Sequence, residues 1–441
     1  MSSLKNITDY VELVCQQIRW KKARARVSVE MKCHIEDGRD FYIAQGLDEK
    51  AATHQAIADT GDATQLGTDF DRVHRPKPQW GMLGAVVAFL ALGIVLSLLI
   101  HDGGDLQRRL VFTAIGIVVM LAAYFVDFTV LGRRPMTVLF VFLALIFLSL
   151  GTFTSHSPIL ALTFPLFLAI CIYQLKIRGY LGISIICIGF FVLMIIAGSG
   201  TVFNTHFFVT GMAIFLVAIW KNWFGVNKII GSLIALVPFY IVTIISIIWG
   251  NPARAAAIIN PASDPLGFGF QSVMTRLALS YSNFVGHGGF PRQFPYPFTF
   301  DPSLNPYVTS LADFLPDATS NLLLTLIIYR YGWLAFMVIM AAILGFIAIG
   351  FMRCFKQRSG LGFLVSFAVM ATFTFQVVTY VLINLGIGIS PISLPLISPG
   401  NAATVVNMGL IGFMLSVFRT GELETDEGVA KSVPPRDSVF D

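Results

Sequence analysis

Charged residues are scarce in this chain: Asp, Glu, Lys and Arg make up 12% of its 441 residues, 56% are apolar, and the mean hydropathy is +0.75. Soluble globular proteins carry about 25% charged residues, so that class is excluded. The formal net charge of +5 is small for this length. Without a clustered basic face it gives no reason to expect nucleic acid as a partner. The composition is that of an integral membrane protein.

Cysteine is also sparse, and the five cysteines form no CxxC pair. All lie in the amino-terminal segment, in apolar runs or in a short basic loop, so we expect no disulfide framework, no zinc site and no other metal ligands. The first apolar run begins only at Trp80, behind a charged segment, and no cleavable signal peptide is therefore expected. The cysteines are Cys15, Cys33, Cys171, Cys187 and Cys354.

Residues 1–79 hold 12 Lys/Arg and 12 Asp/Glu. Apolar spacing and turn residues predict helices over 8–26, 27–44, 49–60 and 63–73. We interpret this segment as a small cytosolic helical domain with a modest core. It resembles the helical prefix domains that precede permease-like proteins, which implies a regulatory or interaction module rather than a reaction. The residues that carry this resemblance are Glu30 to Asp37, Gly46 to Ala51 and Ala58 to Asp62.

From Trp80 onward, apolar segments of membrane-spanning length dominate the chain. A bilayer core of about 30 Å needs roughly 20 helical residues. The predicted fold is therefore all-α: a polytopic membrane protein with about ten transmembrane helices in residues 80–419, preceded by the small cytosolic domain. The predicted spans are 80–100, 110–131, 136–151, 158–175, 179–196, 205–220, 228–249, 333–352, 362–386 and 402–418.

The basic residues of the connecting loops predict the orientation. Lys and Arg occupy alternate connections, while the loops at 152–157, 197–204 and 387–401 have none, so both termini are predicted to be cytoplasmic. Only Arg108 and Arg109, placed in the first outer loop, run against this rule. The same alternation puts the long 250–332 loop on the extracytoplasmic side, and residues 420–441 are predicted to be a disordered cytoplasmic tail.

Four motifs follow one another from the long loop to the last span. They are Asp264 to Gln271, Gly286 to Gly289, Leu315 to Asn321, and Leu394 to Ala403. Together they resemble the SEDS family, the FtsW, RodA and SpoVE cell-cycle membrane proteins, which carry "DP-x-G-x-G-x-Q", "G-x-G", "LPE-x-H-T-D-F" and "LPFISYGGSS" in this order. The large outer loop after the seventh span agrees with the family.

The resemblance implies cell-wall synthesis at the plasma membrane of a bacterium, in elongation, division or sporulation. A SEDS protein polymerises peptidoglycan glycan strands from a lipid-linked precursor, usually beside a class B penicillin-binding protein that cross-links the product. The resemblance implies no defined cofactor. It leaves open whether a divalent cation takes part, because the family chemistry acts on a pyrophosphate-linked donor.

Glycan transfer needs a base beside the attacking sugar hydroxyl. Counting along the family motif places its key aspartate at Asn321, whose amide accepts no proton at neutral pH. Asp313 and Asp317 match acidic positions of the same motif and are the alternative bases, since partial removal from water raises a carboxyl pKa. In the competing interpretation Asp317 bonds backbone amides in a Pro-Asp turn and Asp313 is solvated. Whether the chain is a peptidoglycan glycosyltransferase therefore depends on the consequence of having Asn321 at the family's aspartate position.

The pyrophosphate leaving group needs cationic or hydrogen-bonding partners. Arginines of the long loop are candidates because a guanidinium holds phosphate oxygens bidentately and stays charged, although a single loop arginine is more often solvated. Loop glycines let a headgroup approach the backbone, or they serve as turn residues. The candidate substrate-binding residues are Arg254, Gln271, Arg276, Gly286, Gly288 and Arg330.

Three functions remain open at this point. The first is a SEDS-type glycosyltransferase with a displaced base. The second is a catalytically inactive SEDS relative that binds lipid-linked precursor, or that acts as scaffold or regulator of a cell-wall synthase. The third is a transporter of a lipid-linked precursor, for which paired Gly/Pro interruptions in two halves would be expected and are not evident.

Overall fold

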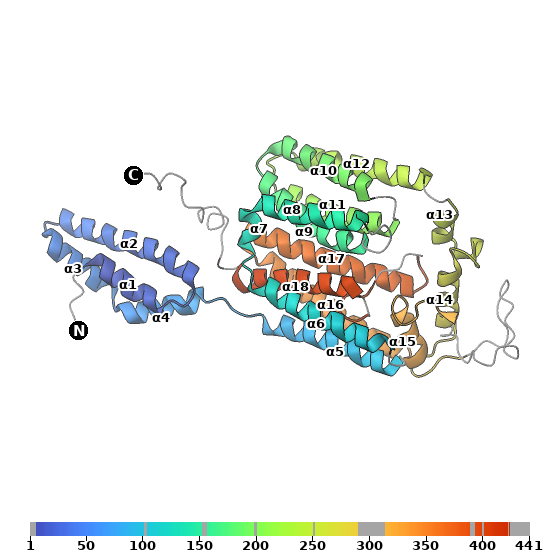
Figure 1. Cartoon of the computed structure of the whole chain (residues 1–441). Coiled ribbons are helices and arrows are strands. Elements are labelled where there is room, and N and C mark those ends of the chain that lie inside the picture. The colour runs from blue at the N-terminus through green and yellow to red at the C-terminus, as the bar shows by residue number, and fades with distance from the viewer. Residues whose placement is uncertain are drawn as a thin grey trace. The chain divides into compact units, whose positions relative to one another are not determined.

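A computed structural model describes residues 6–100, 104–151, 157–197, 201–249, 252–289, 314–388, 393–398, 401–421 and 423. These residues form helices and turns, and no strand occurs among them. The chain separates into two compact units, Met1–Pro78 and Gln79–Asp441 (Figure 1). Asp313 lies outside the described residues, and so does the part of the long loop from 290 to 312.

The first unit is a bundle of four helices. Its core is built from apolar side chains of all four. The prediction of one helix over 8–26 is wrong, because the backbone is extended at Ile18 and the helix breaks there. Ile18 is fully buried in the core, and the Arg19 N–H donates to Asp71 Oδ1 at 2.7 Å. Tertiary contacts thus decide the break. The helices are α1 (Ile7–Gln17), α2 (Lys21–Ala44), α3 (Glu49–Thr60) and α4 (Ala63–His74).

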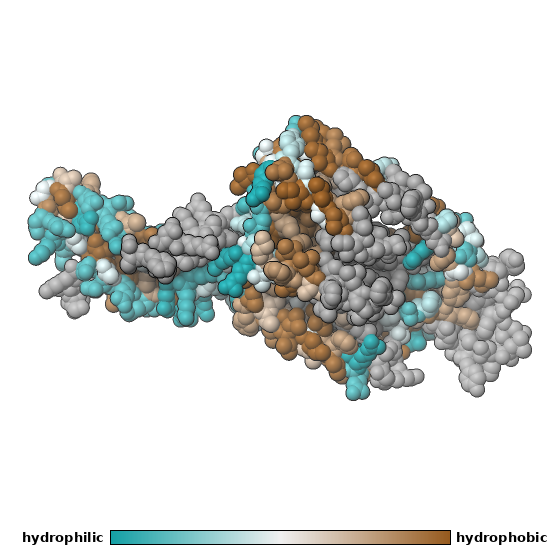
Figure 2. All heavy atoms as spheres, turned by 45° about the horizontal axis from the view of Figure 1, so that its top comes forward, coloured by the Kyte–Doolittle hydropathy of each residue, from teal (hydrophilic) through white to brown (hydrophobic). Residues whose placement is uncertain are grey.

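The second unit consists mainly of long apolar helices. Within the described residues, five are long and apolar enough to cross a membrane and five more form shorter apolar stretches. On the face that Figure 2 shows, the coloured surface of this unit is largely hydrophobic, whereas that of the first unit is largely hydrophilic. The all-α polytopic membrane fold is confirmed. The long helices are α5 (Trp80–Ile100), α6 (Gly104–Phe125), α8 (Pro135–Gly151), α9 (Ser157–Leu175), α10 (Gly179–Ala197), α11 (Thr201–Trp220), α12 (Lys228–Trp249), α16 (Trp333–Phe355), α17 (Gly360–Asn384) and α18 (Asn401–Thr420), with the short α7 (Thr129–Arg133) after α6.

Helix α17 is the centre of the bundle. In its most apolar window 83% of the residues are buried, against 22% in α16. It packs against α9, α11, α16 and α18. Between α17 and α18, the side-chain amides of Gln376 and Asn407 donate to each other at 2.9 and 3.0 Å, and both residues are buried. Helix α17 therefore carries polar groups inside the apolar core, where each needs a partner.

The long loop after α12 is not polar throughout. It contains α13 (Pro252–Ile259), the 3₁₀ turn η1 (Pro261–Ser263), α14 (Phe270–Ser280) and α15 (Leu323–Tyr331). Figure 1 shows α13, α14 and α15 together at one end of the second unit. Every α15 residue from Leu323 to Tyr329 is buried. This end of the bundle therefore has its own packed support, which the composition of the loop did not predict.

Candidate functional site

The turn that precedes α15, residues 314–322, brings Asp317 and Asn321 together. Asp317 has a φ of +50°, a left-handed conformation that Asp and Asn tolerate better than other side chains. Its carbonyl accepts hydrogen bonds from the N–H groups of Ser320, Asn321 and Leu322. Its carboxylate Oδ2 accepts one from Asn321 Nδ2 at 3.1 Å. The residue at the family's aspartate position thus holds the carboxylate of an exposed neighbour.

The C-terminal end of α17 fixes this turn, which we call the Asp317 turn. The Tyr380 hydroxyl donates to the Ser320 carbonyl at 2.8 Å and accepts from the Leu323 N–H at 3.1 Å. One helical turn later, Asn384 Nδ2 donates to the Asn321 carbonyl at 3.0 Å. Tyr380 and Asn384 are fully buried, and their bonds to the turn are buried or partly buried.

Thr325 completes the connection between α17 and α15. Its N–H donates to Asn384 Oδ1 at 2.9 Å and its hydroxyl to the Asn384 carbonyl, also at 2.9 Å. Thr325 is fully buried. Asn384 therefore satisfies backbone groups on both sides of the start of α15, and the position of Asn321 depends on it.

Helix α14 is attached to the same end of α17. Arg276 Nε donates to the Gly386 carbonyl at 3.0 Å, and the Ser272 hydroxyl donates to the Gly388 carbonyl at 2.7 Å. Gly386 has a φ of +75°, and a Cβ there would lie 2.5 Å from Arg276 Cγ. Carbonyl groups of the short segment after Asn384 thus accept hydrogen bonds from α14, while Asn384 itself is hydrogen-bonded to the Asp317 turn.

A small apolar cluster lies where the Asp317 turn and α14 are attached to the end of α17. It joins side chains of α14, the Asp317 turn, α15 and α17. Arg276 is exposed, so the part of its guanidinium beyond Nε is available to a ligand. The arrangement thus combines an exposed carboxylate with an exposed cation on one packed support. The cluster consists of Met274, Ala278, Leu315, Leu322, Leu326, Tyr329 and Ile383.

Gln271 lies in the first turn of α14, one turn before Thr275. The Gln271 Nε2 atom and the Thr275 hydroxyl oxygen are both buried and have no hydrogen-bond partner. A buried polar group left unpaired costs about 1–3 kcal/mol. Because residues four apart share a helix face, these two groups lie on one side of α14, where Thr275 is fully buried and Gln271 is half-buried.

The glycine-rich stretch before Gln271 is a tight turn that starts α14. The Asp264 carboxylate accepts from the N–H groups of Gly267 and Phe268, at 3.1 and 2.8 Å. A Cβ on Gly269 would lie 2.0 Å from the Pro261 carbonyl oxygen and 2.8 Å from that of Asp264. These residues therefore have a structural role in the turn.

Replacing Gly269 with alanine is expected to destabilise the protein, because the atoms it would meet are backbone and cannot rotate away. Overpacking of this kind costs about 1–3 kcal/mol. Gly84→Ala on α5 is the matched control, since nothing lies within 4 Å of its Cβ position. Thermal unfolding in detergent should show a lower Tm for Gly269→Ala alone. Equal Tm values for the two variants would contradict this role.

The candidate glycines Gly286 and Gly288 lie beside the end of α15. Their N–H groups donate to the Tyr331 and Tyr329 carbonyls, at 3.1 and 2.7 Å. A Cβ on Gly288 would lie 2.6 Å from the Tyr329 ring, whereas the space around Gly286, with a φ of +86°, is open. Gly288 is thus a close-packing residue, and Gly286 is a turn glycine that leaves room for a ligand. Arg330 belongs to the last turn of α15 and is half-buried.

The structure joins some candidates and separates others. Asp317, Asn321 and Arg276 share the support of α17. Arg254 belongs to α13, which contacts α12 and the 3₁₀ turn. Asp313 is outside the described residues. Among the described residues no group of three His, Cys, Asp or Glu side chains is placed to hold a metal ion.

The position of Arg109 in the fold shows why Arg108 and Arg109 run against the rule on positive charge in loops. Because α6 begins at Gly104, Arg108 and Arg109 belong to a helix rather than to a loop, and Arg109 is buried. Its guanidinium donates to the Ser97 hydroxyl at 2.6 Å and to the Ile397 carbonyl. A Cβ on Gly93 would lie 2.0 Å from this guanidinium. Arg109 thus ties α5 and α6 to the segment before α18.

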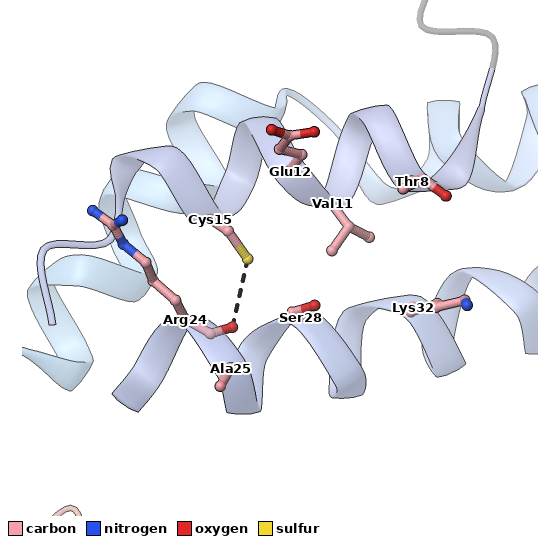
Figure 3. A pocket seen from close by; sticks show the side chains of 8 residues that line it. All are labelled: Thr8, Val11, Glu12, Cys15, Arg24, Ala25, Ser28 and Lys32. Carbon is pink, nitrogen blue, oxygen red and sulfur yellow. Dashed lines mark hydrogen bonds between the residues drawn. The ribbon is translucent and has the colours of Figure 1, made fainter. Parts of the chain in front are cut away.

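The first unit contains a groove between α1 and α2 (Figure 3). Glu12 and Cys15 face it from α1, and Arg24 and Lys32 from α2. The Cys15 thiol donates to the Arg24 carbonyl at 3.6 Å. Burial raises the pKa of this thiol, and the Arg24 guanidinium opposes the effect only in part. The thiol therefore stays protonated at neutral pH and is a poor nucleophile.

Comparison with known proteins finds similarity to one family. The model of the FtsW/RodA/SpoVE family, described as cell cycle proteins, matches residues 305–422, which include the Asp317 turn, α15 and α17. A probable peptidoglycan glycosyltransferase FtsW of Trichlorobacter lovleyi is 23% identical over 371 residues, covering 76% of this chain and 89% of that protein. The FtsW of Buchnera aphidicola is 29% identical over 211 residues, 45% of this chain and 47% of the relative.

Two solved structures share the fold. A chain of a peptidoglycan synthase complex, described as coordinating polymerization and crosslinking, matches with a TM-score of 0.57 and 17% identity, over 79% of this chain and 99% of the other. The rod shape determining protein RodA of Thermus thermophilus matches with a TM-score of 0.50 and 14% identity, over 79% and 98% of the two chains. At these identities the likeness concerns the fold alone.

Proposed function

We propose that this chain, a member of the FtsW/RodA/SpoVE family of multi-pass bacterial membrane proteins, polymerises peptidoglycan glycan strands from a lipid-linked precursor with Asp317 as the base. The reaction would take place on the extracytoplasmic side, with both termini cytoplasmic. A relative named as a probable peptidoglycan glycosyltransferase, which this chain matches over 89% of its length, supports the reaction class.

The observation that carries the proposal is the pairing of Asp317 with Asn321. Although the family's aspartate position is an amide here, that amide donates to a carboxylate four residues earlier at 3.1 Å. The carboxylate is exposed while the turn that holds it is anchored by buried groups. A general base must come within hydrogen-bond reach of the proton that it takes, and an exposed carboxylate on an anchored turn is open to an incoming hydroxyl.

The chemistry follows from these groups. A sugar hydroxyl of one lipid-linked saccharide attacks the anomeric carbon of another, and the bond from that carbon to the pyrophosphate oxygen breaks. Asp317 takes the hydroxyl proton as the new glycosidic bond forms. Asn321 holds Asp317 through one oxygen and leaves the other free for this proton. Its role is positioning, since an amide does not act as a base at neutral pH.

The leaving pyrophosphate needs positive charge and donors. Arg276 fits best among the loop arginines, because its bond to Gly386 fixes the side chain while its outer nitrogens stay exposed. Gln271 on the same helix offers a buried donor without a partner. Arg330 and Arg254 are further phosphate contacts if the substrate extends along α15 or α13. Donors held in place before the reaction stabilise the developing charge most effectively.

The test is a polymerisation assay with purified full-length protein in proteoliposomes and a lipid-linked disaccharide precursor. It is run with and without a class B penicillin-binding protein, the partner class that a peptidoglycan synthase complex suggests. Glycan polymer in either condition is the expected result. If no polymer forms with or without such a partner, while the precursor still binds, the catalytic proposal fails.

Asn321 also favours a second candidate function. If Asp317 does not reach the substrate, the chain binds lipid-linked precursor without polymerising it and serves as scaffold or regulator of a cell-wall synthase. The same assay separates the two functions, because an inactive relative binds the precursor but yields no polymer with any partner.

A further inference from the structure

Most basic residues of the first unit are concentrated in two stretches of its sequence. Eight Lys and Arg residues lie in two stretches, 19–26 and 72–77, and the first stretch contains no Asp or Glu. Acidic residues gather around the end of α2 and the start of α3. The basic residues are Arg19, Lys21, Lys22, Arg24, Arg26, Arg72, Arg75 and Lys77, and the acidic ones are Glu36, Asp37, Asp40, Asp48 and Glu49.

Folding brings the two basic stretches to one end of the unit. The Arg19 N–H donates to Asp71 at 2.7 Å across 52 positions of sequence, and the Arg24 Nε donates to the Ile18 carbonyl. Figure 1 shows the start of α2 and the end of α4 at the same end of the unit. At a rise of about 1.5 Å per residue, Asp37 lies roughly 24 Å along α2 from Lys21. The two charged ends are therefore well separated.

Helix stability does not account for the basic end. The first turn of α2 contains no acidic residue and its N-cap, Trp20, makes no side-chain hydrogen bond. Positive charge in the first turn opposes the helix dipole. Two of the acidic groups near this end are already engaged, because Asp71 binds Arg19 and Glu30 binds Arg26. Lys21, Arg72 and Arg75 remain exposed.

The connection to the next helix places this end close to a membrane. Residues 75–79 separate α4 from α5, and five extended residues span at most about 18 Å. Helix α5 is long and apolar enough to cross a membrane and begins at Trp80, a residue type enriched at the lipid interface. The basic end therefore cannot move far from the headgroup region.

We infer that the basic end of the first unit, residues 19–26 and 72–77, docks on anionic phospholipid headgroups of the membrane that α5 crosses. Lys and Arg clusters next to a span bind anionic lipid through their summed charge. The proposal does not depend on whether Asp317 is catalytic. Docking would fix the unit on the membrane surface and direct its acidic end towards the aqueous phase.

Hydrogen–deuterium exchange of the full-length protein in nanodiscs tests the docking. In discs of phosphatidylcholine with phosphatidylglycerol, peptides covering 18–27 and 71–78 should exchange about threefold more slowly, or slower still, than in discs of phosphatidylcholine alone. About 0.5 M NaCl should remove the difference, because the Debye length is then only a few ångströms. A peptide covering 36–50 should not change. Equal exchange in the two lipids would overturn the proposal.

Charge variants make the test specific. Lys21→Gln/Arg72→Gln/Arg75→Gln should abolish the lipid-dependent protection. Lys32→Gln/Arg39→Gln/Lys50→Gln should retain this protection, although it removes the same number of positive charges from other positions in the unit. Unchanged exchange around Met31 and Ile35, which are core residues, checks that each variant is folded. Equal loss in both variants would overturn the inference.

One further outcome points to a different partner. Salt-sensitive protection that is the same in both lipids would mean that the basic end binds an acidic segment of this chain, such as 422–427, which contains four Asp or Glu residues. That result would also overturn docking on lipid.

Discussion

Asp317→Asn is expected to lower the rate of glycan polymerisation by about 100-fold or more, the usual contribution of a general base. The substitution removes the proton acceptor and little else. Asn tolerates the left-handed backbone of position 317 nearly as well as Asp, and its side-chain oxygen still accepts a bond from Asn321. The measurement is polymer formed per unit time from lipid-linked precursor in proteoliposomes, with thermal unfolding as the check on folding.

Two further variants decide between the candidate bases. Asp313→Asn should leave most of the activity if Asp317 is the base, whereas the reverse pattern would assign the role to Asp313. Asn321→Asp restores the family's residue beside an existing carboxylate, and two carboxylates this close share a proton because both cannot easily ionise. If the wild type is inactive and only Asn321→Asp produces polymer, the chain has lost its base and the second candidate function stands.

The helices could be predicted well where hydropathy alone determines them. The expected span 80–100 coincides with α5, because no tertiary contact competes with a continuous apolar run. The break at Ile18 was missed because Ile18 continues the apolar stripe of Val11 and Val14 at helical spacing. The start of α6 was missed because Arg108 and Arg109 were placed in the first outer loop, whereas Arg109 belongs to the helix and pairs with Ser97 and the Ile397 carbonyl.

The site was only partly predictable. Motif spacing identified Asp317 and Asn321, which are neighbours in sequence and in space. Tyr380 and Asn384 were missed because they lie about 60 positions away in an apolar span with no loop signal. One signal was present: two polar residues four apart on one face of a span, where each needs a partner. Their partners are backbone groups of the Asp317 turn and the first residues of α15, which no side-chain pattern reveals.

Asn384→Leu is expected to have the second large effect, on stability and activity together. Leucine has a similar size but cannot pair with the Thr325 N–H or the Asn321 carbonyl. Each buried group left unpaired costs about 1–3 kcal/mol, so thermal unfolding should occur several degrees lower. Polymerisation should fall at least about tenfold beyond any loss of folded protein, because small displacements of a catalytic group have large effects on rate.

The control is the buried amide pair that Gln376, earlier in α17, forms with Asn407 of α18. Gln376→Met/Asn407→Leu removes both partners of the buried amide pair, and replacing both with apolar groups can be nearly neutral. This double variant should keep its Tm within about a degree or two and retain polymerisation, since neither residue bonds the Asp317 turn. If the double variant lost activity as severely as Asn384→Leu at equal stability, polar pairs along α17 would matter generally. The specific link from Asn384 to the Asp317 turn would then be rejected.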